Sequence, residues 1–225
     1  MHNLAINYLT EDGSSTILFE PSELIDFQNA WDLQREWQEK LRLEPSYKQA
    51  IWMLQHFACY TLGRGASEKN LLFDIDQPPL DLFRIDRGGE VTHHLPGQLV
   101  TYLVLDLHRY KTDLNWYMRT LENVLIDVLH DLGLNGHRVD GMTGVWCDGE
   151  KVGFIGVGCR RWITQHGMAL NVDCDLSGFN GIVPCGLHGY KMGRISNWLP
   201  KVKMNEVRAL IKTNLKKYFG LLWVE

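Results

Sequence analysis

The amino-acid sequence predicts an α+β fold, with a mixed sheet flanked by helices. Three observations support this class: separated amphipathic segments at helical spacing, short apolar segments rich in branched and aromatic residues, and an Asp-Gly turn between two such segments. The chain of 225 residues is 45% hydrophobic and 22% charged, so it can bury a large core. Since no repeat or linker divides the sequence, we expect residues 1–225 to form a single domain.

The first expected helix follows Pro21-Ser22-Glu23 and ends at Pro45. Core packing is the expected role of its apolar face, because the residues recur every three or four positions. This face consists of Phe27, Ala30, Leu33, Trp37 and Leu41.

Two further helices are expected later in the chain. One runs from Tyr117 to Leu132, with Thr112 or Asp113 as N-cap and Gly133 at its end. The other follows Asn205 near the C-terminus. Its polar face carries Lys212, Lys216 and Lys217, which we expect to be solvated.

Short apolar segments predict strands, and the first two of them are expected in one sheet. These strands are 50–54, 100–105, 145–147, 151–157 and 168–172. Asp148-Gly149-Glu150 forms a tight turn between two of them, because Asp and Gly tolerate positive backbone angles. The sequence therefore predicts a hairpin over 145–157.

Charge and hydropathy exclude some classes of partner. A net charge of −4 argues against general attraction to nucleic acid. The N-terminus has no basic and apolar leader, and no apolar run approaches the roughly 18 residues that span a bilayer. We therefore expect a cytoplasmic protein with neither nucleic acid nor membrane as partner.

The five cysteines form an odd set without a C-x-x-C pair. This pattern argues against a disulfide framework and against a common zinc knuckle, so at least one thiol is free. Cys185 is the candidate for an exposed thiol, because rigid Pro184 and permissive Gly186 flank it. Buried or incidental thiols are expected at Cys59, Cys147, Cys159 and Cys174.

Two segments are dense in residues that binding sites require. Residues 87–98 combine an arginine, paired glycines, two histidines and a Pro-Gly turn, so backbone and side-chain donors meet there. They lack the G-K-[ST] ending of a nucleotide phosphate loop, and a purely structural turn is the alternative. In residues 149–157, Lys151 enters an apolar strand, where it lies either at a solvent edge or in a functional site.

Four segments fit an ordered set of motifs. Residues 87–98 fit R-G-G-x-V-T-x-H-x-P-G-Q and residues 149–156 fit G-x-K-[IV]-x-x-[IL]-G. Residues 166–171 fit H-G-x-A-L-N and residues 184–186 fit P-C-G. In order and spacing, from about Tyr60 onward, the chain resembles the lipoyl(octanoyl) transferase family. Many members have glycine where this chain has Leu95, a difference that removes no reactive group.

The resemblance implies a covalent acyl transfer. In this family the P-C-G cysteine takes an acyl group from the phosphopantetheine thioester of acyl carrier protein and passes it to a lysine. Cys185 would carry an octanoyl thioester, and Lys151 would stabilise the thiolate and then act as base. Backbone N–H groups near Cys185 and Gly186, or from the glycine-rich segments, would face the tetrahedral oxyanion. Neither ATP, a metal nor another cofactor is implied.

The resemblance also implies the partners of the reaction. The donor is octanoyl-acyl carrier protein, and the acceptors are lipoyl domains of 2-oxoacid dehydrogenase E2 subunits and the glycine cleavage H protein, in the first step of endogenous protein lipoylation. Acyl carrier proteins are acidic, so a basic patch is expected, with scattered surface charge as the alternative. Its candidates are Arg160, Arg161, Lys191, Arg194, Lys201 and Lys203.

The implied fold is that of the biotin and lipoate protein ligases, with a mixed, largely antiparallel sheet flanked by helices. The implied substrate-binding residues are Arg87, Gly88, Gly89, Glu90, Val91, Thr92, His93, His94, Phe154, Ile155, Gly156, Gly167, Met168 and Ala169. Phe154, Ile155 and Met168 would supply an apolar wall for an aliphatic chain. His94 either orients a neighbour, donates to the acyl carbonyl, or is structural.

Three alternative functions stay open at this point. An ATP-dependent lipoate or biotin protein ligase would share the fold without needing a nucleophilic cysteine. A non-catalytic paralogue would only bind acyl carrier protein or a lipoyl domain. A structural role for the Cys185 thiol would leave the ordered motifs unexplained.

Overall fold

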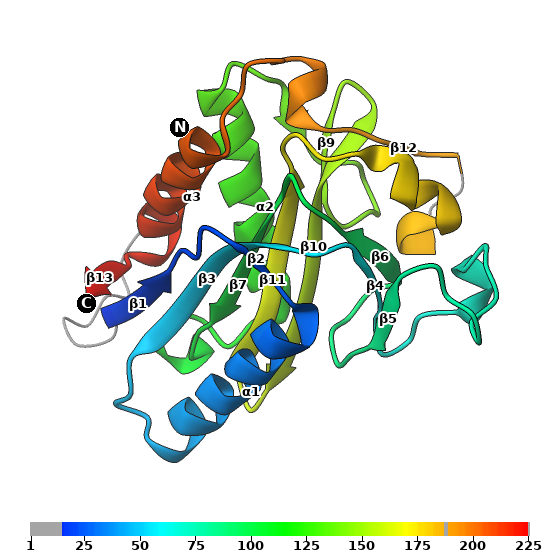
Figure 1. Cartoon of the computed structure of the whole chain (residues 1–225). Helices are drawn as coiled ribbons and strands as arrows, with labels where there is room; N and C mark the ends of the chain where they lie inside the picture. The colour runs from blue at the N-terminus through cyan, green and yellow to red at the C-terminus, as the bar shows by residue number, and fades with distance from the viewer. Residues whose placement is uncertain (1–14, 187–188, 225) are drawn as a thin grey trace.

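The computed structural model describes residues 15–186 and 189–224. A mixed sheet forms the centre of the molecule, with strand order β13-β1-β3-β7-β11-β10-β9-β8 (Figure 1). Its strands are β1 (Ser15–Phe19), β3 (Gln49–His56), β7 (Gln98–Val104), β8 (Gly136–His137), β9 (Val145–Cys147), β10 (Glu150–Arg160), β11 (Ile163–Asn171) and β13 (Leu222–Val224), with β2 (Leu24–Ile25) beside β3 and β12 (Lys191–Met192) beside β10. Along the main path only β1 pairs in parallel, with β3 and β13. The expected mixed, largely antiparallel sheet is confirmed.

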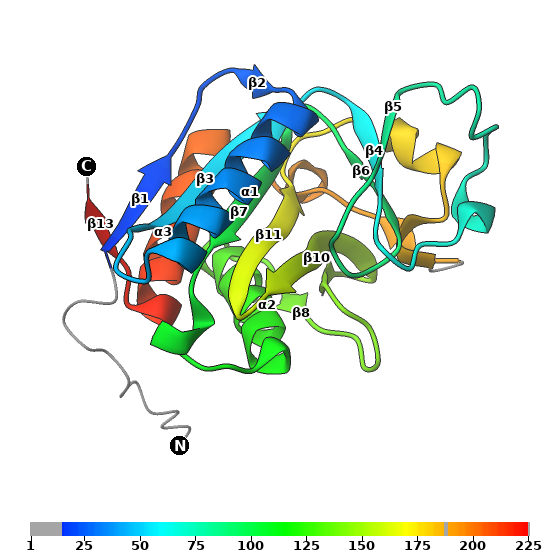
Figure 2. The same ribbon diagram turned by 90° about the horizontal axis from the view of Figure 1, so that it is seen from below.

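Three α-helices cover the two faces of this sheet in the described part of the chain. α1 (Phe27–Leu43) lies on one face, and α2 (Leu114–Asp131) and α3 (Met204–Phe219) lie on the other (Figures 1 and 2). The side chains of Asp26 and Asp113 cap α1 and α2, each accepting a backbone N–H three residues later. Gly133 follows α2 with a φ of 78°.

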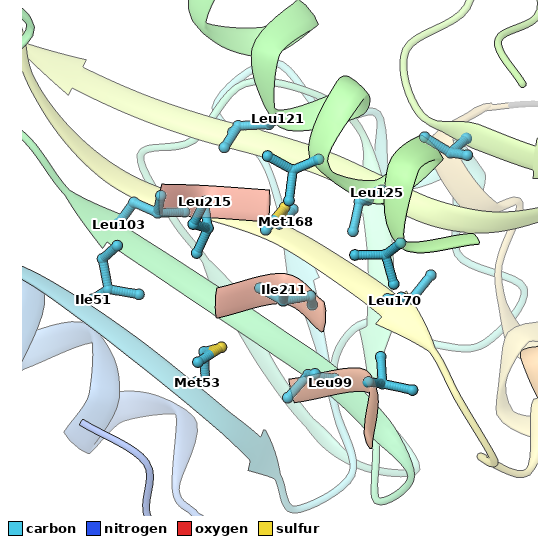
Figure 3. Packing of buried hydrophobic residues seen from close by; sticks show 14 of the residues in the cluster. Ile51, Met53, Leu99, Leu103, Leu121, Leu125, Met168, Leu170, Ile211 and Leu215 are labelled. Carbon is cyan, nitrogen blue, oxygen red and sulfur yellow. The ribbon is translucent and has the colours of Figure 1, made fainter. Parts of the chain in front are cut away.

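The alternation of side chains along the strands divides the core in two. On β3, Ile51 and Met53 face α2 and α3, whereas Ala50, Trp52 and Leu54 face α1. On the α2 and α3 side, leucine, isoleucine and methionine side chains of β3, β7 and β11 meet those of the two helices (Figure 3). The core on the α1 side is shared with a second, smaller sheet.

The second sheet consists of three strands in the order β5-β4-β6. They are β4 (Cys59–Leu62), β5 (Asp81–Arg84) and β6 (Val91–His94). Short 3₁₀ turns complete the structure: η1 (Glu68–Asn70), η2 (Leu107–Arg109), η3 (Leu176–Gly181), η4 (Pro184–Gly186) and η5 (Ile195–Asn197). Because η3 and η4 pack against β6, segments far apart in the sequence meet beside the main sheet.

Most elements expected from the sequence are present, with four corrections. The first helix begins at the Asp26 cap, because β2 occupies the residues before it. Leu33 is not part of the core: it is 47% exposed and points away from the sheet. α3 begins before Asn205, and Lys203 in its N-cap position makes no side-chain cap. On its polar face, Lys212 and Lys217 form ion pairs with Glu20 and Asp127, rather than being only solvated.

The small sheet escaped the sequence analysis, because its strands are only four residues long and lie among glycines and loops. In the sequence, residues 91–94 belong to a glycine-rich segment without a strand pattern, whereas in the structure they form β6. Within the described ranges, no helix is both long enough and apolar enough to cross a bilayer.

The two-sided core predicts the effect of truncating a buried leucine. Leu103 is fully buried between the sheet and the helices α2 and α3, so Leu103→Ala should lower the free energy of unfolding by about 2–5 kcal/mol. Leu33→Ala, at an exposed leucine of α1, should change it by no more than about 0.5 kcal/mol. Urea unfolding followed by circular dichroism measures both. Equal losses would contradict this division between core and surface.

Candidate active site

A cavity of about 270 Å³ lies between the main sheet and the small sheet, on the sheet face that α1 covers. Its walls come from β6, β7, β10 and β11, from residues 85–90, and from residues 141–143 of the loop between β8 and β9. Val100, Phe154 and Ala169 supply apolar wall, whereas Arg87, His94 and Lys151 supply polar atoms. The side chains of Ile155 and Met168, which were expected in this wall, pack into the core on the α2 and α3 side instead, because they alternate with Phe154 and Ala169 along their strands. A site of this kind suits a ligand with an aliphatic chain and a polar end.

The cavity brings together segments that are distant in the sequence. Of the candidate residues, those that line it are Arg87, Gly89, Glu90, Thr92, His94, Lys151, Phe154, Ile155, Gly156, Gly167, Met168 and Ala169. Gly88, Val91 and His93 lie outside its lining. Residues that the sequence analysis did not select also contribute, and they are Ile85, Val100, Tyr102, Gly141, Met142, Thr143 and His166.

An irregularity in β10 directs Lys151 into the cavity. The pairing of β10 with β9 shifts by one residue between Lys151 and Gly153. Val152 is part of the core under α2, and a Cβ on Gly153 would lie 2.9 Å from Leu125 of α2. Two successive residues therefore face α2, and Lys151 and Phe154 both face the cavity. Without this β-bulge, strict alternation would place Lys151 on the same face as Gly153.

The Lys151 ammonium is enclosed by backbone and aromatic rings. The residue is 1% exposed, and Nζ donates to the carbonyl oxygen of Thr143 at 2.9 Å. Nζ also lies 4.9 Å from the centre of the Trp146 ring and 5.3 Å from that of Phe154. Of the two positions left open by the sequence, the solvent edge is therefore wrong. A buried ammonium in a cavity wall is a candidate functional group.

Gly144 leaves room for this lysine. Its φ is 131°, and a Cβ there would lie 2.7 Å from Cε of Lys151 and 2.6 Å from the carbonyl oxygen of Gly153. A side chain at this position would therefore displace the ammonium. Gly144 could not be identified from the sequence, because a single glycine before a strand carries no signal of what it contacts.

Arg87 is a buried cross-link between loop and sheet. Its Nη2 donates to the carbonyl oxygen and to Oγ1 of Thr61, at 2.9 and 2.8 Å, and its Nη1 donates to the carbonyl oxygen of Gly88. A Cβ on Gly156 would lie 2.9 Å from Cδ of Arg87, so this glycine makes space for the arginine. The Gly88 N–H donates to the carbonyl oxygen of Val157, which holds the loop against β10.

His94 belongs to a buried hydrogen-bond network. Nε2 of Gln98 donates to Oδ1 of Asn171 and to the carbonyl oxygen of His93, so Oε1 of Gln98 accepts from Nδ1 of His94 at 2.7 Å. Burial, together with neighbouring His56, holds the pKa of His94 well below its usual range. The neutral imidazole therefore presents an unprotonated Nε2, and its ring stacks on Phe27.

A second polar pair, His56 and Tyr102, lies behind His94. Nδ1 of His56 donates to the carbonyl oxygen of Ile25, so Nε2 accepts from the Tyr102 hydroxyl at 2.8 Å. Burial is the main cause that lowers the pKa of His56 to about 4. Tyr102 reaches the cavity wall, yet the sequence showed it only as an aromatic residue of an apolar strand.

His93 points to the other face of β6. Its Nδ1 donates to the carbonyl oxygen of Cys59, and its ring packs against Tyr60 and Phe179. A Cβ on Gly178 would lie 2.2 Å from its Nε2, so η3 closes directly over it. As successive residues of one strand, His93 and His94 necessarily face opposite sides.

The backbone of Cys185 lies in η4, and its side chain falls outside the described part of the structure. The next residue, Gly186, lies beside Glu90 of the cavity wall: a Cβ on Gly186 would lie 3.4 Å from Cγ of Glu90. Oε2 of Glu90 accepts from the Asn70 side chain, and the Asn70 carbonyl oxygen accepts from the N–H of Val183. These bonds tie the turn that carries Cys185 to the cavity wall.

The amide of Gly186 is already engaged. It donates to the carbonyl oxygen of Val183 at 3.0 Å and thereby closes η4. This particular N–H is therefore occupied, and oxyanion donors near Cys185 or from the glycine-rich segments stay a prediction.

The other cysteines are free thiols with little tendency to ionise. Cys59, Cys147 and Cys174 are buried and Cys159 is half-buried. Burial raises the pKa of Cys59 and Cys174 to about 12. It also raises the pKa of Cys147 and of Cys159.

The basic candidates do not form one patch. Arg160 and Arg161 lie at the turn between β10 and β11, whereas Lys191 pairs in register with Glu150 at the other end of β10. Ten residues of strand separate these ends, roughly 30 Å. Arg194 follows β12 in the chain, and the exposed side chains of Lys201 and Lys203 precede α3.

No group of three or more histidine, cysteine, aspartate or glutamate side chains among the described residues is arranged to hold a metal ion. Polar and charged residues in the cavity lining include Arg87, Glu90, His94 and Lys151.

The buried histidine network predicts an acid-sensitive stability. His56 stays neutral in the folded protein down to a pKa of about 4, whereas the unfolded chain takes up its proton near the ordinary value of 6.5. Its stabilising contribution is complete above 6.5 and is lost as the pH falls toward 4. By about pH 4.5 the loss should reach about 2.5 kcal/mol.

Urea unfolding of the wild type and of His56→Gln, at about pH 7 and about pH 4.5, measures this contribution. The free energy of unfolding of the variant should fall less on acidification, because the other titrating groups are common to both proteins. An equal fall in both would contradict the assigned pKa direction.

Comparison with known proteins places the chain in a family. Residues 26–216 match the family model of the lipoyl protein ligase A/B catalytic domain. An octanoyltransferase of Prochlorococcus marinus (strain SARG) is 72% identical over 224 residues, covering 100% of both chains. An octanoyltransferase of Parasynechococcus marenigrum (strain WH8102) is 56% identical over 211 residues, covering 94% of this chain and 91% of the relative.

Solved structures of low sequence identity share the fold. Lipoate-protein ligase A bound with ATP superposes with a TM-score of 0.72 at 16% identity, covering 95% of this chain and 88% of that one. A bi-partite lipoate protein ligase from Thermoplasma acidophilum gives a TM-score of 0.68 at 15% identity, covering 95% and 86%. The expected lipoate protein ligase fold is confirmed. With the matched catalytic domain and these full-length relatives, the chain belongs to the lipoyl protein ligase A/B catalytic domain family.

Proposed function

We propose that this protein transfers an octanoyl group from octanoyl-acyl carrier protein, through a thioester on Cys185, to a lysine of a lipoyl domain. Octanoyl transfer is the activity for which its full-length relatives are named. The observation that carries the proposal is the buried Lys151 ammonium, held in the wall of a cavity that suits an aliphatic chain. The whole chain, residues 1–225, is proposed to act as one catalytic domain.

The first half of the reaction acylates the enzyme. The Cys185 thiolate attacks the thioester carbonyl carbon of the donor, and the tetrahedral intermediate expels the phosphopantetheine sulfur. The leaving thiolate takes a proton from the Lys151 ammonium, so phosphopantetheine departs as a thiol and Lys151 is left neutral. A free thiol is only slightly ionised at neutral pH, so a nearby ammonium is needed to favour the thiolate. We assign this role to Lys151. It lines the cavity together with Glu90, and Glu90 lies next to Gly186 in η4, the turn that carries Cys185.

The second half regenerates the thiol. The acceptor lysine amine attacks the Cys185 thioester, an amide forms, and the cysteine leaves as thiolate. The attacking amine loses one proton in this step, and Lys151 in its neutral form takes it. The thiolate and the Lys151 ammonium are thereby restored together.

The cavity would hold the octanoyl chain. Val100, Phe154 and Ala169 supply the apolar surface for it. The substrate-binding assignment extends to the rest of the cavity lining, including Arg87 and His94. His94 presents an unprotonated Nε2, which suits it to accept a proton or hydrogen bond rather than to donate one to an acyl carbonyl.

The partners follow from the same chemistry. The donor is proposed to be octanoyl-acyl carrier protein, and the acceptors are lipoyl domains of 2-oxoacid dehydrogenase E2 subunits and the glycine cleavage H protein. A cytoplasmic location is proposed, without ATP, metal or other cofactor. The exposed side chains of Lys191, Lys201 and Lys203 are the basic groups offered to an acidic donor.

Cys185→Ser should abolish octanoyl transfer, because its hydroxyl does not ionise under these conditions. The measurement is intact-protein mass after incubation with octanoyl-acyl carrier protein without ATP, followed by hydroxylamine and peptide mapping. A hydroxylamine-labile octanoyl adduct on Cys185 is expected in the wild type and in Cys159→Ser, a control at a half-buried thiol of raised pKa. Lipoyl-domain modification that requires ATP and free octanoate would instead indicate an ATP-dependent ligase.

Displacing Lys151 should slow acylation without unfolding the protein. Lys151→Ala removes the ammonium, and Gly144→Ala pushes its Cε aside. Gly133→Ala is the matched control, because Gly133 also has a positive φ but no atom within 4 Å of its Cβ position. Single-turnover acylation should fall by about tenfold or more in Gly144→Ala and by no more than about twofold in Gly133→Ala. Equal effects would show that backbone strain alone is responsible.

A further inference from the structure

The buried face of α2 contains a carboxylate among apolar residues. Glu122 is fully buried, between neighbours such as Leu121 and Leu125 of the core. Its Oε2 accepts from Nη1 of Arg119 at 2.7 Å and from Nε of Arg138 at 2.6 Å, and its Oε1 accepts from the N–H of Gly144 at 3.0 Å. An apolar residue would suit this face without the desolvation cost of a charge.

Two of these donors are the ends of one loop. Arg138 begins and Gly144 ends the segment 138–144, which connects β8 with β9. Nη2 of Arg138 further donates to the carbonyl oxygen of Arg119 and to Oδ1 of Asn123, so α2 holds this arginine at several points. A single carboxylate thus clamps both ends of the loop to a rigid helix.

The clamped loop reaches Lys151. Gly141, Met142 and Thr143 lie in the cavity wall, and the carbonyl oxygen of Thr143 accepts from Nζ of Lys151 at 2.9 Å. The next residue is Gly144, whose amide donates to Glu122. Because Gly144 has no side chain, Lys151 can occupy the space beside its Cα. Movement of this loop would therefore change both a hydrogen-bond partner and a wall of the Lys151 site.

We infer that Glu122 is a positioning residue of the active site, which holds Lys151 in place through the 138–144 loop. The inference rests on the proposed function, in which Lys151 governs the reactivity of Cys185. Glu122 does not itself line the cavity, so it acts without touching the acyl group. Its bonds to opposite ends of the loop distinguish it from a carboxylate that only joins two helices.

Asp127 provides the matched control. It lies on the same helix, and its Oδ2 accepts from Nζ of Lys217 and from the hydroxyl of Tyr218, both at 2.7 Å. It thereby ties α2 to α3 and contacts no part of the 138–144 loop in these bonds. Asp127→Ala therefore tests what the loss of an α2 carboxylate does to the fold alone.

The experiment has two readouts on the full chain. The first is the single-turnover rate of acylation by octanoyl-acyl carrier protein, followed by intact mass. The second is the pH dependence of Cys185 alkylation by iodoacetamide, followed by peptide mapping, which reports the ionisation of the thiol without any acyl donor. The variants are Glu122→Ala, Glu122→Gln, Asp127→Ala, Lys151→Ala and the double variant of Glu122→Ala with Lys151→Ala.

Glu122→Ala should slow acylation by about tenfold or more and move the alkylation profile to higher pH, in the direction of Lys151→Ala. Asp127→Ala should stay within about twofold of the wild type. The double variant should be no slower than Lys151→Ala, because Glu122 acts through that residue. Glu122→Gln should retain part of the rate, since its amide oxygen still accepts from Gly144, and it carries the test if Glu122→Ala does not fold by circular dichroism.

The inference would be overturned if a folded Glu122 variant had the same acylation rate and alkylation profile as Asp127→Ala. It would also be overturned if the losses of the two single variants added up in the double variant. Failure of the proposed function looks different, because the wild type would then form no octanoyl adduct on Cys185. In that case the alkylation profiles still decide whether Glu122 positions Lys151 beside the thiol.

Discussion

Strict alternation of side chains across the central sheet is the constraint on which this molecule depends. One face must supply apolar residues to α2 and α3, and the other must serve both α1 and the cavity. A lysine has no place on the first face, where burial of a charge among leucines would be costly. The β-bulge after Lys151 resolves this conflict, since it gives Val152 and Gly153 to α2 and Lys151 and Phe154 to the cavity.

Buried polar groups around the cavity are held by partners of fixed geometry. His94 is bonded to Gln98, Tyr102 to His56, and Arg87 to Thr61. Each pair would cost free energy if one member were left without its partner, so these side chains have little freedom to rearrange. The cavity is consequently preorganised by the sheet, and the 138–144 loop is the part of its wall that depends on a side chain of a distant helix.

Much of the fold could be predicted because its signals are local. The stripe of α2, its Asp113 cap and the Asp148-Gly149 turn each depend on residues a few positions apart, and the structure has them where expected. The small sheet could not be predicted, because four-residue strands carry too little periodicity. Leu33 was predicted to be buried and is exposed. Helical spacing indicates which face of a helix is apolar, but it does not indicate how far the neighbouring elements extend over that face.

The candidate site divides in the same way. The ordered motifs are contiguous in the chain, so the resemblance that they carry, and the cysteine and lysine that it proposes for acyl transfer, can be recognised from the sequence. Only the folded chain decides that Lys151 turns inward, that His93 and His94 face opposite sides, and that Gly144, Tyr102 and Glu122 belong to the surroundings of the site. These outcomes depend on strand register, on a bulge and on contacts across many residues, and none of those is encoded in a short stretch of sequence.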